Sequence, residues 1–395
     1  MKFLSIALLV LALASASNWA VLVCGSEGMW NYRHHADIAH AYQIMKKGGI
    51  EPDHIITLMY NDVPFAEGNP FPGKLYNHPG DDTPDVYEGV VVDYEKKEVS
   101  PETLIKVLTG DKSTGKKVLE STEEDNIFLF FSDHGGPDVL CLPEGDLHSA
   151  DLLAAIKKMH EKKMYNKFVL YIEACYSGSM FLNLPEDLNV LAVTAANDHE
   201  SSWGWYCGDE AVVKGKELGT CLGDEFSVFW MEDADKGEQK TETLDEQFNR
   251  LVPGVTKSHV MRYGDKSFIN DVIGEFIGYP KEQKNVEHQM SFVQWDSRDN
   301  ELLYRRYMAD TTGEKKWQKA YEEEVAHRKA VDAYFAALTT EPRFYQRASN
   351  VKNVNCYKTA IEQFHAIMGK SDYAIKYYDV FANMCAENPK AFAGY

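Results

Sequence analysis

The sequence predicts an α/β protein: a mostly parallel sheet with helices on both faces, followed by a small all-helical segment. Between residue 18 and about residue 280, short apolar runs rich in β-branched and aromatic residues alternate with helical patterns. Such alternation is typical of strand–helix–strand units and of a parallel sheet. After about residue 280 only helical patterns remain. With 395 residues, the chain has room for one large domain and a smaller one.

The N-terminus differs from everything after it. Lys2 is followed by the apolar run FLSIALLVLALA and then by the small residues ASAS. This three-part pattern is typical of a cleaved secretory signal, which we assign to residues 1–17 with the cut at Ala16 or Ser17. A membrane anchor is the alternative, but the run is too short to span a bilayer comfortably. We expect a mature protein without a membrane span in the secretory pathway, in a lysosome or acidic vesicle, secreted, or associated with the cell surface.

Five apolar runs predict the strands of the first domain. Two helical patterns between them cover residues 36–49, which end on a Gly-Gly stop, and residues 148–164. The stretch 61–100, rich in Pro, Gly, Asn and Asp, predicts a surface excursion with a hairpin at residues 89–99. The strand runs are WAVLVCG (19–25), HIITLMY (54–60), IFLFFSDHGG (127–136), KFVLYIEAC (167–175) and LNVLAVTAAN (188–197).

The C-terminal part divides into a polar linker, residues 281–310, and a helical domain, residues 311–395. Residues 301–395 carry 14 basic and 12 acidic side chains, a formal charge of +2, which leaves −22 for residues 1–300. An acidic body and a slightly basic tail predict electrostatic docking. A permanent accessory domain is the alternative. The net charge of −20 argues against nucleic acid as a partner, because phosphate binding needs concentrated Lys and Arg.

Seven cysteines in an oxidising compartment leave at least one unpaired. Cys207 and Cys221 flank a Gly-, Lys- and Glu-rich loop, while Cys356 and Cys385 lie in the helical tail, and we expect a disulfide within each pair. Of the remaining three cysteines, only Cys175 has neighbours that suggest chemistry.

Two predicted strands end in reactive side chains. One run ends in SDHGG, which places His134 just past its strand, and the other ends at Cys175. A single helical pattern joins the two runs, so a right-handed crossover brings both ends to one rim of the sheet, where functional groups gather. A thiol needs such an imidazole to accept its proton. Taken singly, a turn histidine and a buried small cysteine are the simpler interpretations; together in one strand–helix–strand unit they favour a nucleophile and its base.

Five motifs in order resemble the legumain family of asparaginyl endopeptidases, within the caspase-like clan. The resemblance is strong over residues 18–280 and weaker in the tail, which is similar to the family's C-terminal prodomain. It implies a caspase-like catalytic domain at residues 18–280, an activation segment at 281–310 and a prodomain at 311–395. The motifs are NYRHHAD (31–37), SDHGG (132–136), EACYSGSM (173–180), TAAN with ESSW (194–203) and CLGDEFSVFWMED (221–233).

The resemblance also implies roles for individual residues. Cys175 would be the nucleophile, His134 the general acid and base, Asn31 the residue that supports the histidine, and Gly135 the donor of an oxyanion-hole amide. Asp133 matches a position that can form a succinimide in the family, although Gly136 stands here where Ser or Thr would follow. The substrate-binding residues implied are Arg33, His34, Glu173, Ser202 and Asp224.

Such a pocket suits an asparagine side chain. A carboxamide offers one acceptor and one donor group, so Arg33 can donate to its oxygen while Glu173 and Asp224 accept from its nitrogen. An ionised aspartate would bring negative charge towards those two carboxylates, and we expect it to be cleaved only in acid, as the neutral acid. An ordinary surface ion pair is the alternative for Arg33 and Asp224.

The sequence therefore predicts a cysteine endopeptidase cutting after Asn, made as an inhibited zymogen with candidate self-cleavage at Asn300 and Asp310. No cofactor and no metal are expected. The expected partners are peptide or protein substrates and the protein's own prodomain, with cystatin-type inhibitors as a further class, and the expected state is a monomer. The alternatives are a transpeptidase using the same thioester and a catalytically silent binding module.

Overall fold

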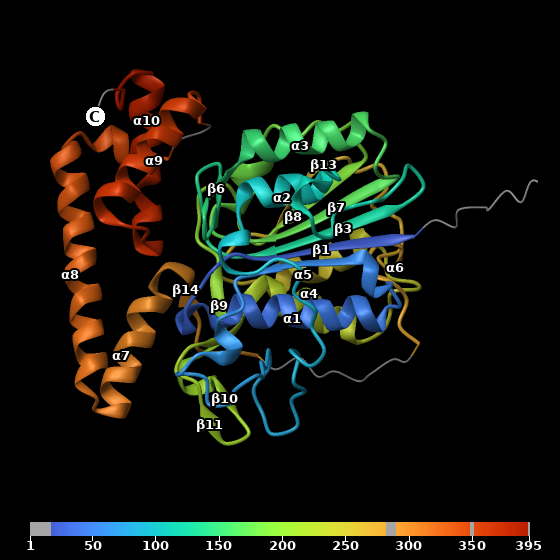
Figure 1. Cartoon of the computed structure of the whole chain (residues 1–395), viewed down its shortest axis with the longest axis horizontal. Helices are drawn as coiled ribbons and strands as arrows, with labels where there is room; N and C mark the ends of the chain where they lie inside the picture. The colour runs from blue at the N-terminus through green and yellow to red at the C-terminus, as the bar shows by residue number, and fades with distance from the viewer. Residues whose placement is uncertain (1–16, 282–289, 348–350, 394–395) are drawn as a thin grey trace, which may run out of the picture.

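A six-stranded sheet forms the centre of the molecule (Figure 1). The computed structural model describes residues 17–281, 290–347 and 351–393, so the predicted signal segment lies outside it except for Ser17. The strand order is β13-β8-β7-β3-β1-β2, and all neighbours run parallel except the pair β13 and β8. The strands are β1 Asn18–Cys24, β2 Ile55–Met59, β3 Asn126–Ser132, β7 Lys167–Glu173, β8 Val190–Thr194 and β13 Met261–Gly264. The predicted mostly parallel sheet is confirmed.

Helices cover both faces of this sheet, also as predicted (Figure 1). One apolar core lies under α2 and α3, and a second lies under α1, α4, α5 and α6. Strand side chains alternate between the two cores: Val21 and Val23 belong to the first, and Ala20 and Leu22 to the second. The helices are α1 Tyr32–Lys47, α2 Pro101–Leu108, α3 Ser149–Glu161, α4 Glu225–Asp235, α5 Leu244–Gly254 and α6 Gly274–Ile277.

Three smaller sheets lie outside the central one. β4, β5 and β6 form an antiparallel unit directly after β3, while β12, β9 and β14 form another. Each brings backbone close to the carboxyl ends of the parallel strands. Their bounds are β4 Gly135–Gly136, β5 Val139–Leu142, β6 Gly145–His148, β9 Trp203–Cys207, β12 Cys221–Asp224 and β14 Trp295–Asp296, with β10 Val212–Val213 and β11 Lys216–Glu217 as a separate pair.

The hairpin predicted at residues 89–99 is wrong. The backbone N–H groups of Asp93 and Tyr94 both donate to the carbonyl of Thr57, and the Asp93 carboxylate accepts from the Thr57 N–H. Tyr94 and Leu58 form a parallel bridge. The segment is held along the free edge of β2 and does not fold back on itself, because that edge satisfies its hydrogen bonds.

The C-terminal part is helical, as predicted, and packs around its own apolar core. Its helices are α7 Asn300–Thr312, α8 Lys315–Leu338, α9 Val354–Met368 and α10 Tyr378–Glu387, with the short 3-10 helix η10 at Asp372–Tyr377. The predicted linker contains two elements that were not expected, β14 and most of α7. Both expected disulfides, Cys207–Cys221 and Cys356–Cys385, are confirmed. Within the described residues, none of the helices combines the length and apolar character needed to cross a bilayer.

Candidate active site

The ends of β3 and β7 carry the predicted imidazole and thiol. The two strands pair in parallel with Ser132 opposite Glu173, so the residues that follow them, including His134 and Cys175, come from adjacent strand ends. Both side chains are buried. Directly after Cys175 the chain turns through Tyr176, which has a left-handed backbone with a φ of 56°. This sharp turn ends β7 at the thiol.

His134 is oriented by Asn31, the last residue of the 3-10 helix η1 at Met29–Asn31. The imidazole Nε2 lies 2.9 Å from Asn31 Oδ1, and the Asn31 amide nitrogen donates to the carbonyl of Glu27 at 3.0 Å. Because the amide oxygen can only accept, Nε2 must carry the proton of a neutral ring. The other nitrogen, Nδ1, is buried without a hydrogen-bond partner among the described residues. In the neutral ring, Nδ1 is therefore the nitrogen that can accept a proton.

The sulfur of Cys175 faces Ser202 at the start of the groove. Sγ accepts a hydrogen bond from the Ser202 N–H at 3.3 Å and lies 3.7 Å from the Ser202 hydroxyl oxygen. Burial raises the pKa of the Cys175 thiol above its ordinary value, while Arg298 works in the opposite direction. In this state the thiol is therefore protonated, and its hydrogen bonds within the described chain involve Ser202 and not His134.

The glycines after His134 leave room for close backbone approach. A Cβ added to Gly135 would lie 2.5 Å from the Cys175 carbonyl oxygen, and one added to Gly136 would lie 2.6 Å from Ile375 of η10. A side chain at either position would require backbone or neighbouring groups to move. The second contact also means that the tail lies against this glycine pair.

Arg33 forms the buried cationic part of the pocket. Its Nε donates to Asp224 Oδ1 at 2.8 Å, and its Nη1 donates to Asn31 Oδ1 at 3.2 Å. The guanidinium and the Asp224 carboxylate are both fully buried. Nη2 is 3.5 Å from the carbonyl oxygen of Ser297. The Nε and Nη1 atoms are thus held by Asp224 and Asn31, while Nη2 is turned towards the carbonyl oxygen of Ser297.

Glu173 lies at the end of β7 with one oxygen satisfied. Oε2 accepts from the Ser227 N–H at 3.0 Å and from its hydroxyl at 2.9 Å, whereas Oε1 is buried without a hydrogen-bond partner among the described residues. Burial and the nearby Asp224 carboxylate raise the pKa of Glu173 well above its ordinary value. Of the two remaining predicted pocket residues, Ser202 lies beside Cys175, and His34 places its Nε2 3.5 Å from Asp224 Oδ2. The structure thus brings the predicted pocket residues to one region next to the thiol.

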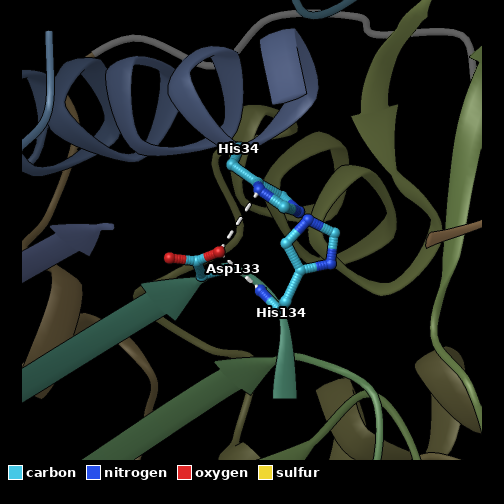
Figure 2. Close-up of side chains that lie close together, drawn as sticks. All are labelled: His34, Asp133 and His134. Carbon is cyan, nitrogen blue, oxygen red and sulfur yellow. Dashed lines mark hydrogen bonds and ion pairs between the residues drawn. The ribbon is translucent and has the colours of Figure 1, made fainter. Parts of the chain in front are cut away.

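His34, Asp133 and His134 form a compact buried cluster (Figure 2). One donor atom from each lies within 4.8 Å of the others. His34 Nδ1 hydrogen-bonds the Ser26 hydroxyl at 2.7 Å, and Asp133 Oδ1 accepts from the His134 N–H at 2.6 Å. All three side chains therefore already have protein partners, because His134 Nε2 also lies 2.9 Å from Asn31 Oδ1. Burial lowers the pKa of His34 well below its ordinary value and raises that of Asp133 to about 7.

The same contact bears on the predicted succinimide. Ring closure at Asp133 joins its side-chain carbonyl carbon to the backbone nitrogen of His134, and that nitrogen already lies 2.6 Å from a carboxyl oxygen. Burial favours the neutral acid, which is the form that can lose water. Formation of the succinimide stays a prediction.

Strand β14 leads into Ser297, which contacts Ser202 beside the thiol. It pairs antiparallel with β9, with Trp295 opposite Gly204 and Asp296 opposite Trp203. The next residue, Ser297, donates its N–H to the carbonyl of Ser202 at 3.2 Å, and the two serine hydroxyl oxygens are also 3.2 Å apart. An extended segment of the protein's own chain is thus added to the exposed edge of β9.

The tail also reaches His134, the predicted general acid and base. Asp372 of η10 places Oδ2 3.1 Å from His134 Nε2. Burial alone would lower the pKa of His134, but the Asp372 carboxylate raises it above its ordinary value. Burial would raise the pKa of Asp372, and His134 lowers it. The imidazole is therefore stabilised in its charged form, which cannot accept a proton from a thiol.

The two candidate self-cleavage positions differ in accessibility. Asn300 is fully buried at the start of α7, and its amide donates to the carbonyl of Asp296 at 3.2 Å. Asp310 lies near the other end of α7 and is exposed, 3.6 Å from Arg306. Cleavage at either residue stays a prediction, but Asn300 can be reached only after α7 moves.

Sequence reasoning missed several residues that complete the site. Asp37 follows Arg33 by four positions on α1, so helical spacing within the motif NYRHHAD could have identified it. Ser132 lies within SDHGG and could have been found in the same way. Ser227 lies within CLGDEFSVFWMED and was also missed, whereas Asn77, Ser297 and Asp372 lie in segments with no pattern that points to the site.

Comparisons with known proteins agree with this geometry. A model of the peptidase C13 family matches residues 18–331. The vacuolar-processing enzyme delta-isozyme of Arabidopsis thaliana is 39% identical over 94% of this chain and 87% of its own length. The legumain of Canavalia ensiformis is 36% identical over 93% of this chain and 85% of its own. A hemoglobinase of Schistosoma japonicum is 42% identical over 73% of this chain and 68% of its own.

Among solved structures, a caspase-1 from Spodoptera frugiperda aligns over 68% of this chain and 92% of its own, with a TM-score of 0.38 and 8% identity.

Proposed function

Because the chain belongs to the peptidase C13 family and is a cysteine endopeptidase, we propose that it hydrolyses peptide bonds after asparagine, and after aspartate in acid. The observation that carries the proposal is the pocket beside Cys175. There the buried Arg33 guanidinium is paired with Asp224, and Glu173 keeps one oxygen without a partner among the described residues.

In the proposed reaction, His134 Nδ1 takes the proton of the Cys175 thiol, and the sulfur attacks the carbonyl carbon of the scissile bond. The N–H groups of Gly135 and Cys175 stabilise the oxyanion that forms. The protonated imidazole then gives its proton to the leaving amine, which leaves a thioester on Cys175. Water, deprotonated by His134, attacks the thioester and releases the acid product and the free thiol. Asn31 keeps the ring in the required orientation throughout.

The specificity follows from the hydrogen-bonding capacity of the pocket. Arg33 offers donors to the oxygen of a substrate carboxamide, and the Oε1 atom of ionised Glu173 offers an acceptor to its nitrogen. A bound carboxamide therefore opposes the rise in the Glu173 pKa that burial and Asp224 cause in its absence. An ionised aspartate side chain has no donor for Glu173 and adds a negative charge near Asp224. Protonated aspartic acid has an O–H donor and is neutral, so it can replace asparagine in acid.

We further propose that the chain is an inhibited zymogen. β14 lies along β9 as an extended peptide would, and Ser297 lies at the mouth of the pocket, with its carbonyl oxygen 3.5 Å from Arg33 Nη2. Asp372 pairs with the catalytic histidine. Release of both contacts is required before a substrate can reach Cys175. The contacts Lys358–Asp151 and Arg347–Asp198 place basic tail groups on acidic groups of the body, as the charge distribution predicts.

The expected setting is an acidic compartment. The names vacuolar-processing enzyme and legumain support a vacuole- or lysosome-type location for this chain as well. Peptide or protein substrates and the C-terminal segment itself are the proposed partners. Cystatin-type inhibitors would compete for the same groove.

The test compares fluorogenic Ala-Ala-Asn and Ala-Ala-Asp peptides with the acid-activated protein, from about pH 4 to about pH 7. An aspartate side chain has an ordinary pKa of about 3.9, so the ratio of kcat/KM for Asp over Asn should fall by about tenfold for each pH unit above it. A Cys175→Ser variant should cleave neither peptide. Equal hydrolysis of both peptides at neutral pH would contradict the pocket assignment.

A second measurement tests whether Cys175 is reactive and whether the full-length chain is inhibited. An asparagine-based, thiol-reactive probe should label Cys175 in the activated protein and not in the full-length chain at neutral pH. A chain that labels equally in both states is not an inhibited zymogen. A chain that labels in neither state is a silent binding module.

A further inference from the structure

We propose that Asp37 is a positioning residue of the specificity pocket, which holds the Asp224 carboxylate in the orientation that pairs it with Arg33. The inference rests on the proposed function, because Arg33 is the group assigned to bind the substrate carboxamide. The inference adds a residue to that function. Asp37 contacts no substrate itself, but it holds Asp224, and Asp224 in turn holds Arg33.

Helix α1 supplies both Arg33 and Asp37, one turn apart and on the same face. Asp37 is fully buried. Its Oδ2 accepts from the Ser132 hydroxyl at 3.1 Å, and the same hydroxyl lies 3.5 Å from Asp224 Oδ2. The Asp224 N–H approaches Asp37 Oδ1 at 3.4 Å. Asp37 is therefore linked to Asp224 through both its backbone and a shared serine.

Asp37 is itself held from the opposite side by Asn77, which belongs to the long surface excursion. The Asn77 amide nitrogen donates to Asp37 Oδ1 at 2.8 Å and to the carbonyl of Leu222 at 2.9 Å. Asn77 Oδ1 lies 2.9 Å from His40 Nδ1, and His40 Nε2 lies 2.8 Å from Asp235 Oδ2. A continuous series of hydrogen bonds thus runs from Asp235 of α4 through His40 of α1 and Asn77 to Asp37.

The space around this series is filled. A Cβ added to Gly223 would lie 2.8 Å from Asn77 Nδ2 and 3.1 Å from Asp37 Oδ1. The absence of a side chain at Gly223, one residue before Asp224, allows the two polar groups to approach β12. A side chain at residue 223 would therefore displace Asn77 or Asp37.

Three carboxyl groups, those of Asp37, Asp224 and Glu173, lie near the single guanidinium of Arg33. They can share this buried site if some of them are protonated. The titratable groups that face it are Asp224 at the end of β12, Glu173 at the end of β7 and the thiol of Cys24 at the end of β1. Burial, then Asp224 and Glu173, raise the pKa of Asp37 well above its ordinary value. A protonated Asp37 can donate a hydrogen bond to Asp224 and leave that carboxylate its full charge for Arg33.

The geometry gives different expectations for two substitutions. In Asp37→Asn the amide nitrogen can donate as the protonated carboxyl does, and the amide oxygen can still accept from Asn77. In Asp37→Ala both the donor and the acceptor are lost, and the Asp224 carboxylate loses its support. A merely structural acid would not distinguish the two in substrate binding once both proteins are folded.

The experiment measures kcat and KM for the Ala-Ala-Asn peptide with acid-activated full-length protein, with active sites counted by the thiol-reactive probe and folding checked by thermal melting. Asp37→Ala should raise KM by about tenfold with a smaller change in kcat, because ground-state and transition-state binding are lost together. Asp37→Asn should stay within about threefold of the wild type. Asp187→Ala, an exposed position, is the matched control and should change neither constant.

A wild-type KM in folded Asp37→Ala would overturn the proposal, and so would equal losses in Asp37→Ala and Asp37→Asn. If Asp37→Ala does not fold, Asn77→Ala replaces it: the Asp37 carboxyl then loses its strongest donor, and KM should still rise. Unchanged KM in that variant also overturns the proposal. Failure of the proposed function is a different result, since the wild type would then show no preference for asparagine.

Discussion

Asn31 determines which nitrogen of His134 can act as a base. Its amide oxygen accepts from Nε2 and from Arg33 Nη1, while its amide nitrogen is used by the Glu27 carbonyl. All of its polar atoms are therefore committed, so the residue cannot flip without losing hydrogen bonds. The imidazole is left with Nδ1 as its only available acceptor. One side chain thus connects the histidine to the specificity arginine.

Replacing Asn31 with alanine should remove this control of the tautomer. We expect kcat for the Ala-Ala-Asn peptide to fall by about tenfold to a hundredfold, because general base catalysis typically contributes about a hundredfold or more. KM should change less, since Arg33 keeps its bond to Asp224. Steady-state kinetics of the activated variant provide the measurement, with the exposed Asn183→Ala as the control. An unchanged kcat would show that the ring needs no support from Asn31.

At the scale of residues, the sequence predicted the reactive and charged groups of the motifs, missed Asp37, Ser132 and Ser227 within those same motifs, and missed the contributing groups outside them. Cys175 and His134 follow adjacent parallel strands, so the right-handed crossover rule alone brought them to one edge. Asn77 and Ser297 reach the same region from 40 and 264 positions away from their hydrogen-bond partners Asp37 and Arg33. Neither lies in a periodic or motif-like pattern. Such contacts are fixed by tertiary packing, which a single sequence does not encode locally.

At the scale of helices and strands, prediction from the sequence was likewise limited to segments with a clear apolar pattern. The five parallel strands of the sheet were predicted because their apolar runs are buried almost throughout. The antiparallel edge strand β13 was not predicted, because only its last residue, Gly264, is buried. Helix α7 was not predicted, because only three of its residues are buried: Asn300, Tyr304 and Ala309. That is too few apolar positions to form a recognisable stripe. β14 is two residues long, and its backbone pairs with β9 whatever its side chains are.

The 3-10 helix η10 supplies the contact that we expect to set the pH dependence of activation. His134 has a raised pKa in the pair and Asp372 a lowered one. His134, whose pKa is raised, stabilises docking at low pH and loses that effect as the pH rises through its pKa in the docked state. Asp372, whose pKa is lowered, stabilises docking at higher pH and loses that effect as the pH falls through its pKa in the docked state. The pair is therefore intact between about pH 4 and about pH 6.5, taken from the ordinary pKa values.

Asp372→Asn should accordingly shorten the lag before activity appears in mild acid. Transferring the full-length chain to about pH 5 and following hydrolysis of the Ala-Ala-Asn peptide measures that lag. We expect it to shorten by about tenfold, the lower end of the range for a charged hydrogen bond worth about 1.5–3 kcal/mol, because Asp372 is partly exposed. The final activity should equal that of the wild type, since under the proposed activation the segment that carries Asp372 leaves the active site in both proteins. Glu323→Gln, on the exposed side of α8, is the control. An unchanged lag would place the rate-limiting contact elsewhere in the tail.

Over the whole molecule, the tail and body are joined by apolar and polar contacts together. Val139 of β5 belongs to the apolar core of the tail, and the Tyr357 hydroxyl donates to the Pro137 carbonyl at 2.7 Å. Lys370 donates to the Leu142 carbonyl at 2.8 Å. Only the charged pairs respond directly to protonation of carboxylates. The charge asymmetry read from the sequence therefore accounts for part of the docking and not for its apolar core.

The titration of buried carboxyl groups predicts that the full-length chain is most stable in mild acid. Burial raises the pKa of Asp133 and Glu301 to about 7 and that of Asp146 to about 6. Each group holds a proton in the folded state that the unfolded chain releases above about pH 4, so stability falls as the pH rises through that interval. Asp235 acts in the opposite sense: its pKa is lowered to about 2, so its contribution is lost only below about pH 4.

Asp146→Asn isolates one of these contributions. Asp146 lies on β6 opposite Cys141, and Lys370 of the tail opposes the effect of burial on its pKa. The amide mimics the protonated carboxyl, so the variant should melt like the wild type near pH 4 and be more stable by about 1–2 kcal/mol near pH 7, after allowing for solvent screening. Thermal melts of both chains in a Cys175→Ser background, which prevents self-cleavage, give the comparison. Parallel melting curves across the whole pH range would mean that Asp146 ionises equally in the folded and unfolded chains.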